Sequence, residues 1–230
     1  MWRRALIACV AAACATAAQA DITGARYADP TTRYDHGILG DAVEWGALEL
    51  TMDRGKTRRI VLPESRVFED LEPRLVDLDN DGAPEVITIE TDLNRGARLA
   101  IYGAKGLIAA TPFIGSTHRW LAPLGAADLD GDGKVEIAYI DRPHLTKLLR
   151  VWRYDRGALT LVAEKTGLTN HSIGQDFISG GIRDCGAGPE IITANADWSR
   201  VIATRLAGGK LTSRTLETRS LPAAVDCSEN

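Results

Sequence analysis

The sequence predicts an all-β protein assembled from repeated units. Two acidic loops with the same spacing, residues 77–85 and 128–136, are each followed by a β-branched and aromatic run that is typical of a buried strand. The glutamates that end these loops, Glu85 and Glu136, lie 51 residues apart. Units of about 50 residues with three or four antiparallel strands are typical of β-propeller blades. We therefore predict a small β-propeller of about four blades.

The two acidic loops have the residue types of a calcium cage. Side-chain oxygens stand at positions 1, 3, 5 and 9 of each loop, and a glycine at position 6 lets the chain reverse around an ion. Alternating aspartates would repel one another in a compact turn unless a hard cation neutralised them. An EF-hand is excluded, because it needs a glutamate at position 12, which is Thr88 in one loop and Tyr139 in the other. The alternative is a pair of solvated turns without an ion.

The first 20 residues have the pattern of a secretory signal peptide. An arginine pair precedes an apolar run over residues 5–18, and small residues favour cleavage after Ala20. The run is shorter than the roughly 20 residues that a spanning helix needs, so we expect no membrane insertion. We divide the chain into this signal peptide, residues 1–20, and one domain, residues 21–230, that is periplasmic or secreted.

The charge of the chain disfavours a polyanionic partner. Its formal net charge is −4, and loss of the two arginines of the signal peptide would bring it to −6. A surface this acidic does not suggest binding to nucleic acid or to an anionic membrane.

Cysteine usage predicts one disulfide. Cleavage after Ala20 would leave Cys185 and Cys227 as the only two cysteines, in an oxidising compartment where such pairs form bridges. In the chain-entropy model, a closed loop of this size stabilises the fold by roughly 4 kcal/mol. Two free thiols are the alternative.

Weaker copies extend the repeat on both sides of the two loops. Residues 181–190 form a copy with one inserted residue, in which Cys185 aligns with the aspartates at position 5. We therefore hypothesise that the disulfide replaces the metal in that unit. A first copy without calcium ligands is marked by Glu44. The units leave three arrangements open, namely a four-bladed ring, a five-bladed ring closed by pairing of the chain ends, and an incomplete arc.

Two histidines recur at similar spacing. His118 and His171 precede the glutamates of their units by 18 and 19 residues, which predicts structurally equivalent positions. They are candidate ligand-binding residues. The competing interpretation is a repeated structural hydrogen bond.

The acidic loops resemble the FG-GAP and VCBS repeats, which are calcium-loop repeats known from the propellers of integrin α-subunits and from many secreted bacterial proteins. The resemblance implies two Ca²⁺ sites. The implied ligands are Asp77, Asp79, Asp81, Glu85 and the Ala83 carbonyl in one loop, and Asp128, Asp130, Asp132, Glu136 and the Lys134 carbonyl in the other. Ions saturated by protein oxygens leave little room for a substrate, so we expect the calcium to be structural.

The motifs of the common catalytic centres are missing from residues 21–230. They contain no Gly-x-Ser-x-Gly elbow, no His-Glu-x-x-His motif and no phosphate-binding glycine loop. We therefore expect a non-catalytic scaffold that binds a protein or a glycan. The alternatives are a hydrolase or lyase acting on carbohydrate or phosphoester, with His118 and His171 as acid and base, and a purely structural assembly module.

Overall fold

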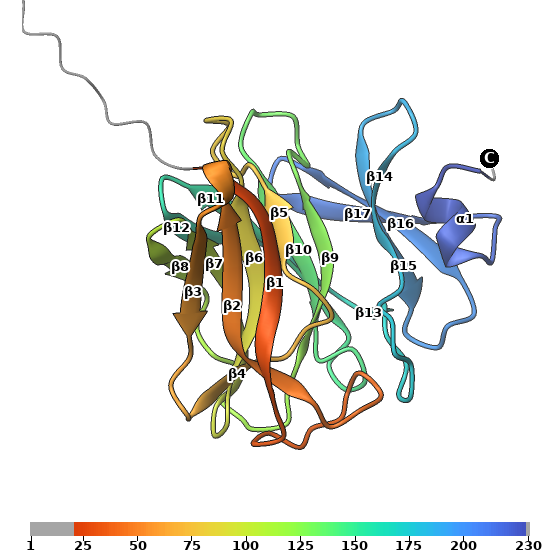
Figure 1. Ribbon diagram of the computed structural model, residues 1–230. Helices are drawn as coiled ribbons and strands as arrows, with labels where there is room; N and C mark the ends of the chain where they lie inside the picture. The colour runs from red at the N-terminus through yellow and green to blue at the C-terminus, as the bar shows by residue number, and fades with distance from the viewer. Residues whose placement is uncertain (1–20, 229–230) are drawn as a thin grey trace, which may run out of the picture.

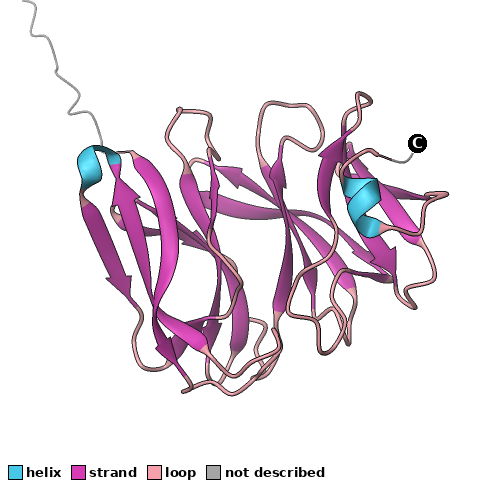
Figure 2. Ribbon diagram, turned by 45° about the vertical axis from the view of Figure 1, so that its right-hand side comes forward, coloured by secondary structure: helices cyan, strands magenta, loops and turns pink. Residues whose placement is uncertain are grey.

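The computed structural model describes residues 21–228 and shows an all-β protein with curled antiparallel sheets (Figure 1). The predicted signal peptide lies outside the described residues. The sheets follow one another across the molecule in chain order, as the colours of Figure 1 show. The short helix α1 (Leu221–Val225) lies beside the last of them (Figure 2). The predicted all-β, propeller-like class is thus confirmed at the level of curled sheets. Within residues 21–228, no helix is long and apolar enough to span a membrane.

The first sheet has eight strands in two halves. The first half consists of β1 (Ile22–Thr31), β2 (Glu44–Met52) and β3 (Thr57–Val61), with a 3-10 turn, η1 (Asp53–Gly55), before β3. The second half consists of β4 (Arg66–Phe68), β5 (Arg74–Val76), β6 (Glu85–Asp92), β7 (Gly96–Gly103) and β8 (Gly106–Ala110). One ladder pair, Trp45 with Phe68, joins the halves. Each half therefore makes nearly all of its ladder pairs within itself.

The second and third sheets each correspond to one repeat. The second sheet consists of β9 (Leu121–Ala127), β10 (Glu136–Asp141), β11 (Leu148–Asp155) and β12 (Ala158–Thr166). The third consists of β13 (Leu168–Thr169), β14 (Gly181–Asp184), β15 (Pro189–Asn195), β16 (Val201–Ala207) and β17 (Lys210–Thr215). β13 and β14 both pair with β15, so segment 170–180 interrupts what is a single strand, β9, in the second sheet.

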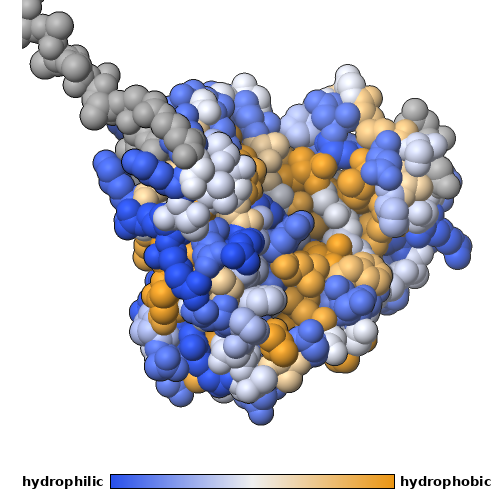
Figure 3. Space-filling model, in the orientation of Figure 1, coloured by the Kyte–Doolittle hydropathy of each residue, from blue (hydrophilic) through white to orange (hydrophobic). Residues whose placement is uncertain are grey.

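The core lies between neighbouring sheets. Alternate side chains of β2, such as Leu48 and Leu50, face a cluster that also contains Phe68 and Tyr102 of the second half. β6 is buried over its whole length, because it has neighbouring sheets on both faces. Each fully buried leucine or isoleucine contributes about 1.5–3 kcal/mol. Figure 3 shows further apolar residues in the hollow between the third sheet and the rest of the molecule.

The first half-sheet turns a polar face outward. Because Leu48 and Leu50 point into the core, Glu49 between them points to the opposite face of β2. There it forms ion pairs with Arg26 and Arg59, and Arg59 also pairs with Asp29. A polar outer face is typical of a repeat that ends an array.

The third sheet is instead covered by helix α1. The side chains of Leu221 and Ala224 pack on Ile192 and Ala203 of β15 and β16. Along the chain the terminal ladders join β1 to β2 and β17 to β16, and no ladder of the described residues joins the first sheet to the third. The pairing of the chain ends that we considered for ring closure is therefore not present among these residues.

The predicted first copy of the repeat is misplaced. Glu44 begins β2 directly after segment 32–43, which lies at the lower end of the molecule in Figure 1, whereas the acidic loops lie at the upper end. Burial, together with the nearby carboxylates of Glu69, Asp41 and Asp70, raises the pKa of Glu44 to about 9. Glu44 therefore starts a strand of opposite direction and is not a counterpart of Glu85.

Candidate functional site

Loop 77–85 is folded by its own carboxylates. The side chain of Asp77 accepts hydrogen bonds from the backbone N–H groups of Asp81 (3.2 Å) and Gly82 (2.9 Å). Gly82 has a φ of 91°, which a residue with a side chain rarely adopts. Glu85 begins β6, and its Oε2 accepts from the N–H of Leu78 at 3.0 Å, so the end of the loop is tied back to its start.

Loop 128–136 repeats this turn. Asp128 accepts from the N–H groups of Gly131 (2.8 Å), Asp132 (3.1 Å) and Gly133 (2.9 Å). Glu136 begins β10 and accepts from the N–H of Leu129 at 2.9 Å. The two loops also touch, because the Asn80 side-chain amide donates to the Gly133 carbonyl at 3.1 Å. The two predicted cages are therefore near-identical neighbours.

Each loop gathers three carboxylates. Ligand atoms lie within 4.8 Å of one another for Asp77, Asp79 and Glu85 in one loop, and for Asp128, Asp130 and Glu136 in the other. The remaining predicted side-chain ligands, Asp81 and Asp132, lie outside these clusters and accept hydrogen bonds from the N–H groups of Ala83 (2.8 Å) and Lys134 (3.0 Å). The carbonyl oxygens predicted for Ala83 and Lys134 stay a prediction.

The electrostatics of the clusters fit a hard cation. Burial, and then the charges of Asp79, Asp81 and Asp77, raise the pKa of Glu85. In the second loop, Oδ1 of Asp130 is buried without a hydrogen-bond partner among the described residues. An all-oxygen donor set suits Ca²⁺ or Mg²⁺, with Ca²⁺ favoured by flexible carboxylate ligands. These residues could therefore hold an ion that supplies the missing positive charge.

One arginine distinguishes the two loops. The guanidinium of Arg153, on β11, contacts Asp130 (2.8 Å), Asp132 (2.9 Å) and Glu136 (2.6 Å). Burial still raises the pKa of Glu136, although Arg153 opposes that shift. Among the described residues, no Lys, Arg or His forms an ion pair with the carboxylates of loop 77–85. Arg153 thus neutralises part of the negative charge of the second loop.

The ladder register corrects the alignment of the third copy. In each unit, the strand residue that pairs with the glutamate is followed directly by an aspartate. These aspartates are Asp77, Asp128 and Asp184. The glutamate lies eight positions after this aspartate in the first two loops and six positions after it in the third. The third loop is therefore shorter by two residues, not longer by one, and Cys185 corresponds to Leu78 and Leu129 rather than to a metal ligand.

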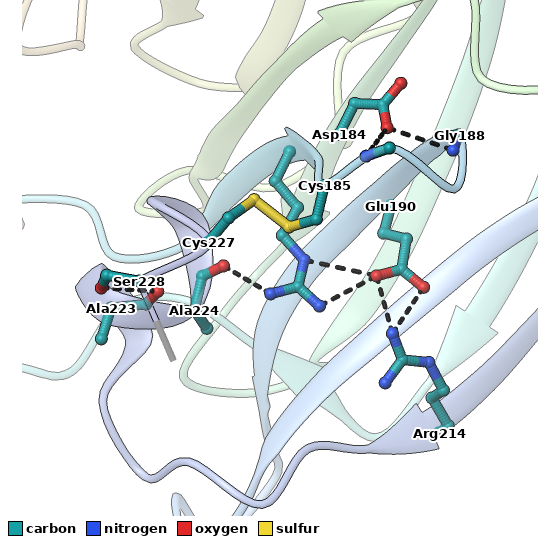
Figure 4. Close-up of a disulfide and its surroundings, with 11 residues drawn as sticks. Asp184, Cys185, Gly188, Glu190, Arg214, Ala223, Ala224, Cys227 and Ser228 are labelled. Carbon is teal, nitrogen blue, oxygen red and sulfur yellow. Dashed lines mark hydrogen bonds and ion pairs between the residues drawn. A yellow bond between two sulfur atoms is a disulfide. The ribbon is translucent and has the colours of Figure 1, made fainter. Parts of the chain in front are cut away.

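The predicted disulfide is present. Cys185 and Cys227 are bonded, with their Cα atoms 5.8 Å apart, and the bridge ties the third loop to the segment after α1 (Figure 4). Asp184 still accepts from the N–H groups of Gly186 (2.8 Å) and Gly188 (3.1 Å). The turn therefore forms without counterparts of the middle aspartates of the first two loops.

Arginines surround the glutamate of the third loop. Glu190 accepts from Arg183 (2.9 Å), Arg205 (2.8 Å) and Arg214 (2.9 Å), and Arg183 also donates to the Ala224 carbonyl at 2.6 Å. Figure 4 shows Arg214 against Glu190. Burial acts to raise the pKa of Glu190, but the hydrogen bonds from Arg205, Arg183 and Arg214 outweigh it and lower the pKa to about 2. Glu190 is therefore ionised and neutralised by the chain itself.

The predicted equivalence of His118 and His171 is wrong. By ladder register, Leu121 and Leu168 occupy the same position, because each pairs with the residue five places after the glutamate of its unit. His118 lies three residues before that position and His171 three residues after it. The similar spacing in the sequence arises because segment 170–180 lengthens the third unit while its loop is shorter.

Both histidines nevertheless lie at the end of the molecule opposite the acidic loops. The ring of His118 stacks on Tyr34, with centroids 5.2 Å apart, and its Nε2 lies 3.4 Å from Asp35. His171 is fully buried, and hydrogen bonds engage both of its ring nitrogens. His36 and His144 lie beside these two residues, and no local sequence signal indicated that they would.

Comparison with known families identifies the acidic repeat. Residues 77–139, which include both loops, match the model of the FG-GAP-like repeat. The match confirms the family that the two loops resemble, over the part of the chain that carries them. No curated protein matches the chain.

Proposed function

We propose that the protein is a secreted or periplasmic calcium-binding β-propeller of about four blades that acts as a non-catalytic scaffold for a protein or glycan ligand. The observation that carries the proposal is the pair of loops, each with three carboxylates within 4.8 Å, on an all-β framework with an FG-GAP-like repeat. The disulfide supports an oxidising compartment outside the cytoplasm.

Calcium has a structural role in this proposal. In loop 77–85 the ion would join two aspartates of the turn to Glu85, the first residue of a fully buried strand. Without an ion, three carboxylates that face one another destabilise the turn, and Glu85 is additionally desolvated. The contact from Asn80 to Gly133 would then couple the two loops. Extracellular modules of this kind bind Ca²⁺ at about 0.1–1 mM.

The test is affinity capture from the native extracytoplasmic extract, with the oxidised mature protein as bait. It is run with calcium and with a chelator, while a thermal melt monitors folding. We expect a partner to be captured only with calcium and the chelator to lower the melting temperature. An Asp79→Asn, Asp130→Asn variant is the matched control, because the chelator should no longer change its melt.

Two results would count against the proposal. Capture and melting that are both unaffected by the chelator would contradict the calcium-dependent scaffold. Turnover in a screen of glycans and phosphoesters would favour the hydrolase or lyase alternative, although His171, with both ring nitrogens engaged inside the protein, is poorly placed as an acid or base.

A further inference from the structure

All four histidines of the chain gather around one cavity. The cavity has a volume of about 280 Å³ and lies at the end of the molecule opposite the acidic loops. Its walls come from three loop segments, 36–38, 142–145 and 173–174, and from residues 118–120 just before β9. His36, His118 and His144 line it, and His171 lies behind His144. Loops from different sheets therefore converge on a single concave site, which is the usual setting of a ligand pocket.

A chain of hydrogen bonds fixes the proton of His144. His171 Nε2 lies 3.1 Å from the Gln175 carbonyl, which can only accept, so this nitrogen carries the proton of the ring. Burial lowers the pKa of His171 and keeps it neutral, so its Nδ1 accepts. That Nδ1 lies 2.9 Å from His144 Nε2, which must therefore donate. In the neutral ring of His144 this leaves a lone pair on Nδ1, and His144 is one of the residues that line the cavity.

The cavity also has one unpaired cation. Two arginines line it, and the guanidinium of Arg142 is occupied by Asp141 at 2.7 and 3.2 Å. Arg119 donates to the His118 carbonyl at 2.7 Å and forms no ion pair with a carboxylate of the described residues. Its charge contributes, after burial, to the lowered pKa of His36. Asp35 lies against His118 and Glu69 lies against His36. The unpaired positive charge of this wall is therefore at Arg119, which disfavours a metal ion there and favours an anion.

The rim of the cavity is apolar and open to solvent. Leu145 is 63% exposed and Ile173 is 82% exposed, and both line the cavity. Ile38 adds a partly buried apolar wall. Two large aliphatic side chains this exposed at the mouth of a cavity indicate a surface that an apolar group covers.

We infer that this cavity is the ligand site of the scaffold and that it takes the C-terminal residue of a partner polypeptide. The free carboxylate pairs with Arg119, the amide N–H of the same residue donates to His144 Nδ1, and an apolar side chain packs on Leu145 and Ile173. A peptide C-terminus presents an anion, a donor and an apolar group within one residue, and the cavity presents their three complements. The inference rests on the proposed function of a binding scaffold and specifies its partner.

The test uses fluorescently labelled peptides that end in leucine or phenylalanine, each as the free acid and as the amide. We expect the free acids to bind and the amides to bind about tenfold more weakly, because the charge-assisted contact with Arg119 is lost. Arg119→Gln should weaken the free acids by a similar factor without changing the melting temperature. Arg156→Gln, at an exposed arginine outside the cavity, is the matched control and should change neither.

Two further binding experiments test the amide N–H and the apolar side chain of the ligand separately. The free acid 4-methylpentanoate has the carboxylate and the apolar group but no amide N–H, so it should bind more weakly than the peptide acids. Leu145→Ser should reduce the preference for an apolar last residue. Equal binding of acids and amides, unchanged binding by Arg119→Gln, or no binding of any peptide to the wild type would overturn the inference.

Capture from the native extract distinguishes this inference from the scaffold proposal. A partner captured by the wild type and by Arg156→Gln but not by Arg119→Gln supports both. The same partner captured equally by all three proteins leaves the scaffold intact and refutes the cavity as its ligand site. Specific peptide binding without any captured partner supports the cavity and counts against the proposed cellular role.

Discussion

Loop 77–85 and loop 184–190 make related turns but place their buried glutamates in opposite electrostatic environments. Glu85 is clustered with other carboxylates, and its pKa is raised by burial and by those charges. Glu190 faces three arginines, and its pKa is lowered to about 2. Loop 128–136 lies between these extremes, because Arg153 reaches its cluster.

The three loops show that the backbone of the turn forms in the same way whichever group neutralises its carboxylates. An aspartate that accepts backbone N–H groups begins all three loops, so the backbone is organised in the same way in each. We expect the positive charge to come from an ion in the first loop and from an ion together with Arg153 in the second, whereas arginines supply it in the third. The third loop, which is two residues shorter, has a disulfide in addition. The following variants test this gradient.

The largest effect should come from the third loop's covalent bond. Replacing both cysteines, Cys185→Ser with Cys227→Ser, should lower the free energy of unfolding by up to about 4 kcal/mol, because the unfolded chain gains the freedom of a long loop. Urea denaturation under oxidising conditions measures this. The chelator should have the same effect on this variant as on the wild type. An unchanged unfolding midpoint would show that the bridge does not stabilise the unit.

An effect of similar size should come from Glu190. Glu190→Gln leaves the guanidinium of Arg183, which is almost fully buried, without its anion, and loss of one partner of a buried pair costs about 3–5 kcal/mol. Thermal and urea denaturation of the oxidised protein measure the loss. Arg156→Gln, which removes a surface pair, is the control and should change stability by less than about 1 kcal/mol.

Lowering the pH should reproduce part of the loss of stability expected for Glu190→Gln. The folded-state pKa of Glu190 is depressed, so its stabilising contribution is complete above the ordinary glutamate pKa and disappears as the pH falls toward about 2. The difference in stability between the wild type and Glu190→Gln should therefore shrink as the pH falls from about 5 to about 2. A difference that stays constant over this range would mean that the charge of Glu190 is not what stabilises the third unit.

The features that the sequence predicted correctly are local. The acidic loops, the strands that follow them and the FG-GAP-like repeat over residues 77–139 are encoded within short segments, and counting cysteines was enough to predict the bridge. The errors arose where equivalent positions were inferred from spacing in the sequence, without the ladder register of the strands. A shorter third loop together with the inserted segment 170–180 made His118 and His171 look equivalent, and Glu44 was matched without knowing the direction of its strand.

The features that escaped prediction depend on contacts between distant segments. Arg153 lies 17 residues after Glu136 and reaches it only because β10 and β11 pair with that register. Arg119, His36 and His144 come from three different loops, and only the stacking of the sheets brings them to one cavity. No local pattern marks such residues, because each of them is an ordinary polar residue in its own segment.

A moderate effect on calcium affinity should come from Arg153. Arg153→Gln should tighten Ca²⁺ binding at loop 128–136 by about tenfold, because the ion no longer competes with a resident cation. Calorimetric titration in an Asp79→Asn background isolates this loop. Arg150→Gln is the matched control on the same strand, since Arg150 pairs with Glu164 and Asp141 instead. Weaker binding after Arg153→Gln would show that the arginine organises the site rather than competing for it.

The smallest effect, and the one most diagnostic of the first loop, should come from Glu85→Gln. In the presence of a chelator this variant should be more stable than the wild type by up to about 1 kcal/mol, because it removes a desolvated charge that three aspartates repel. The amide oxygen can still accept from the Leu78 N–H, so the turn keeps its closing hydrogen bond. With saturating calcium the order should reverse, because the ion loses a charged ligand. Melting curves of both proteins under both conditions give the result, and a loss of stability that is the same with and without calcium would place no ion at Glu85.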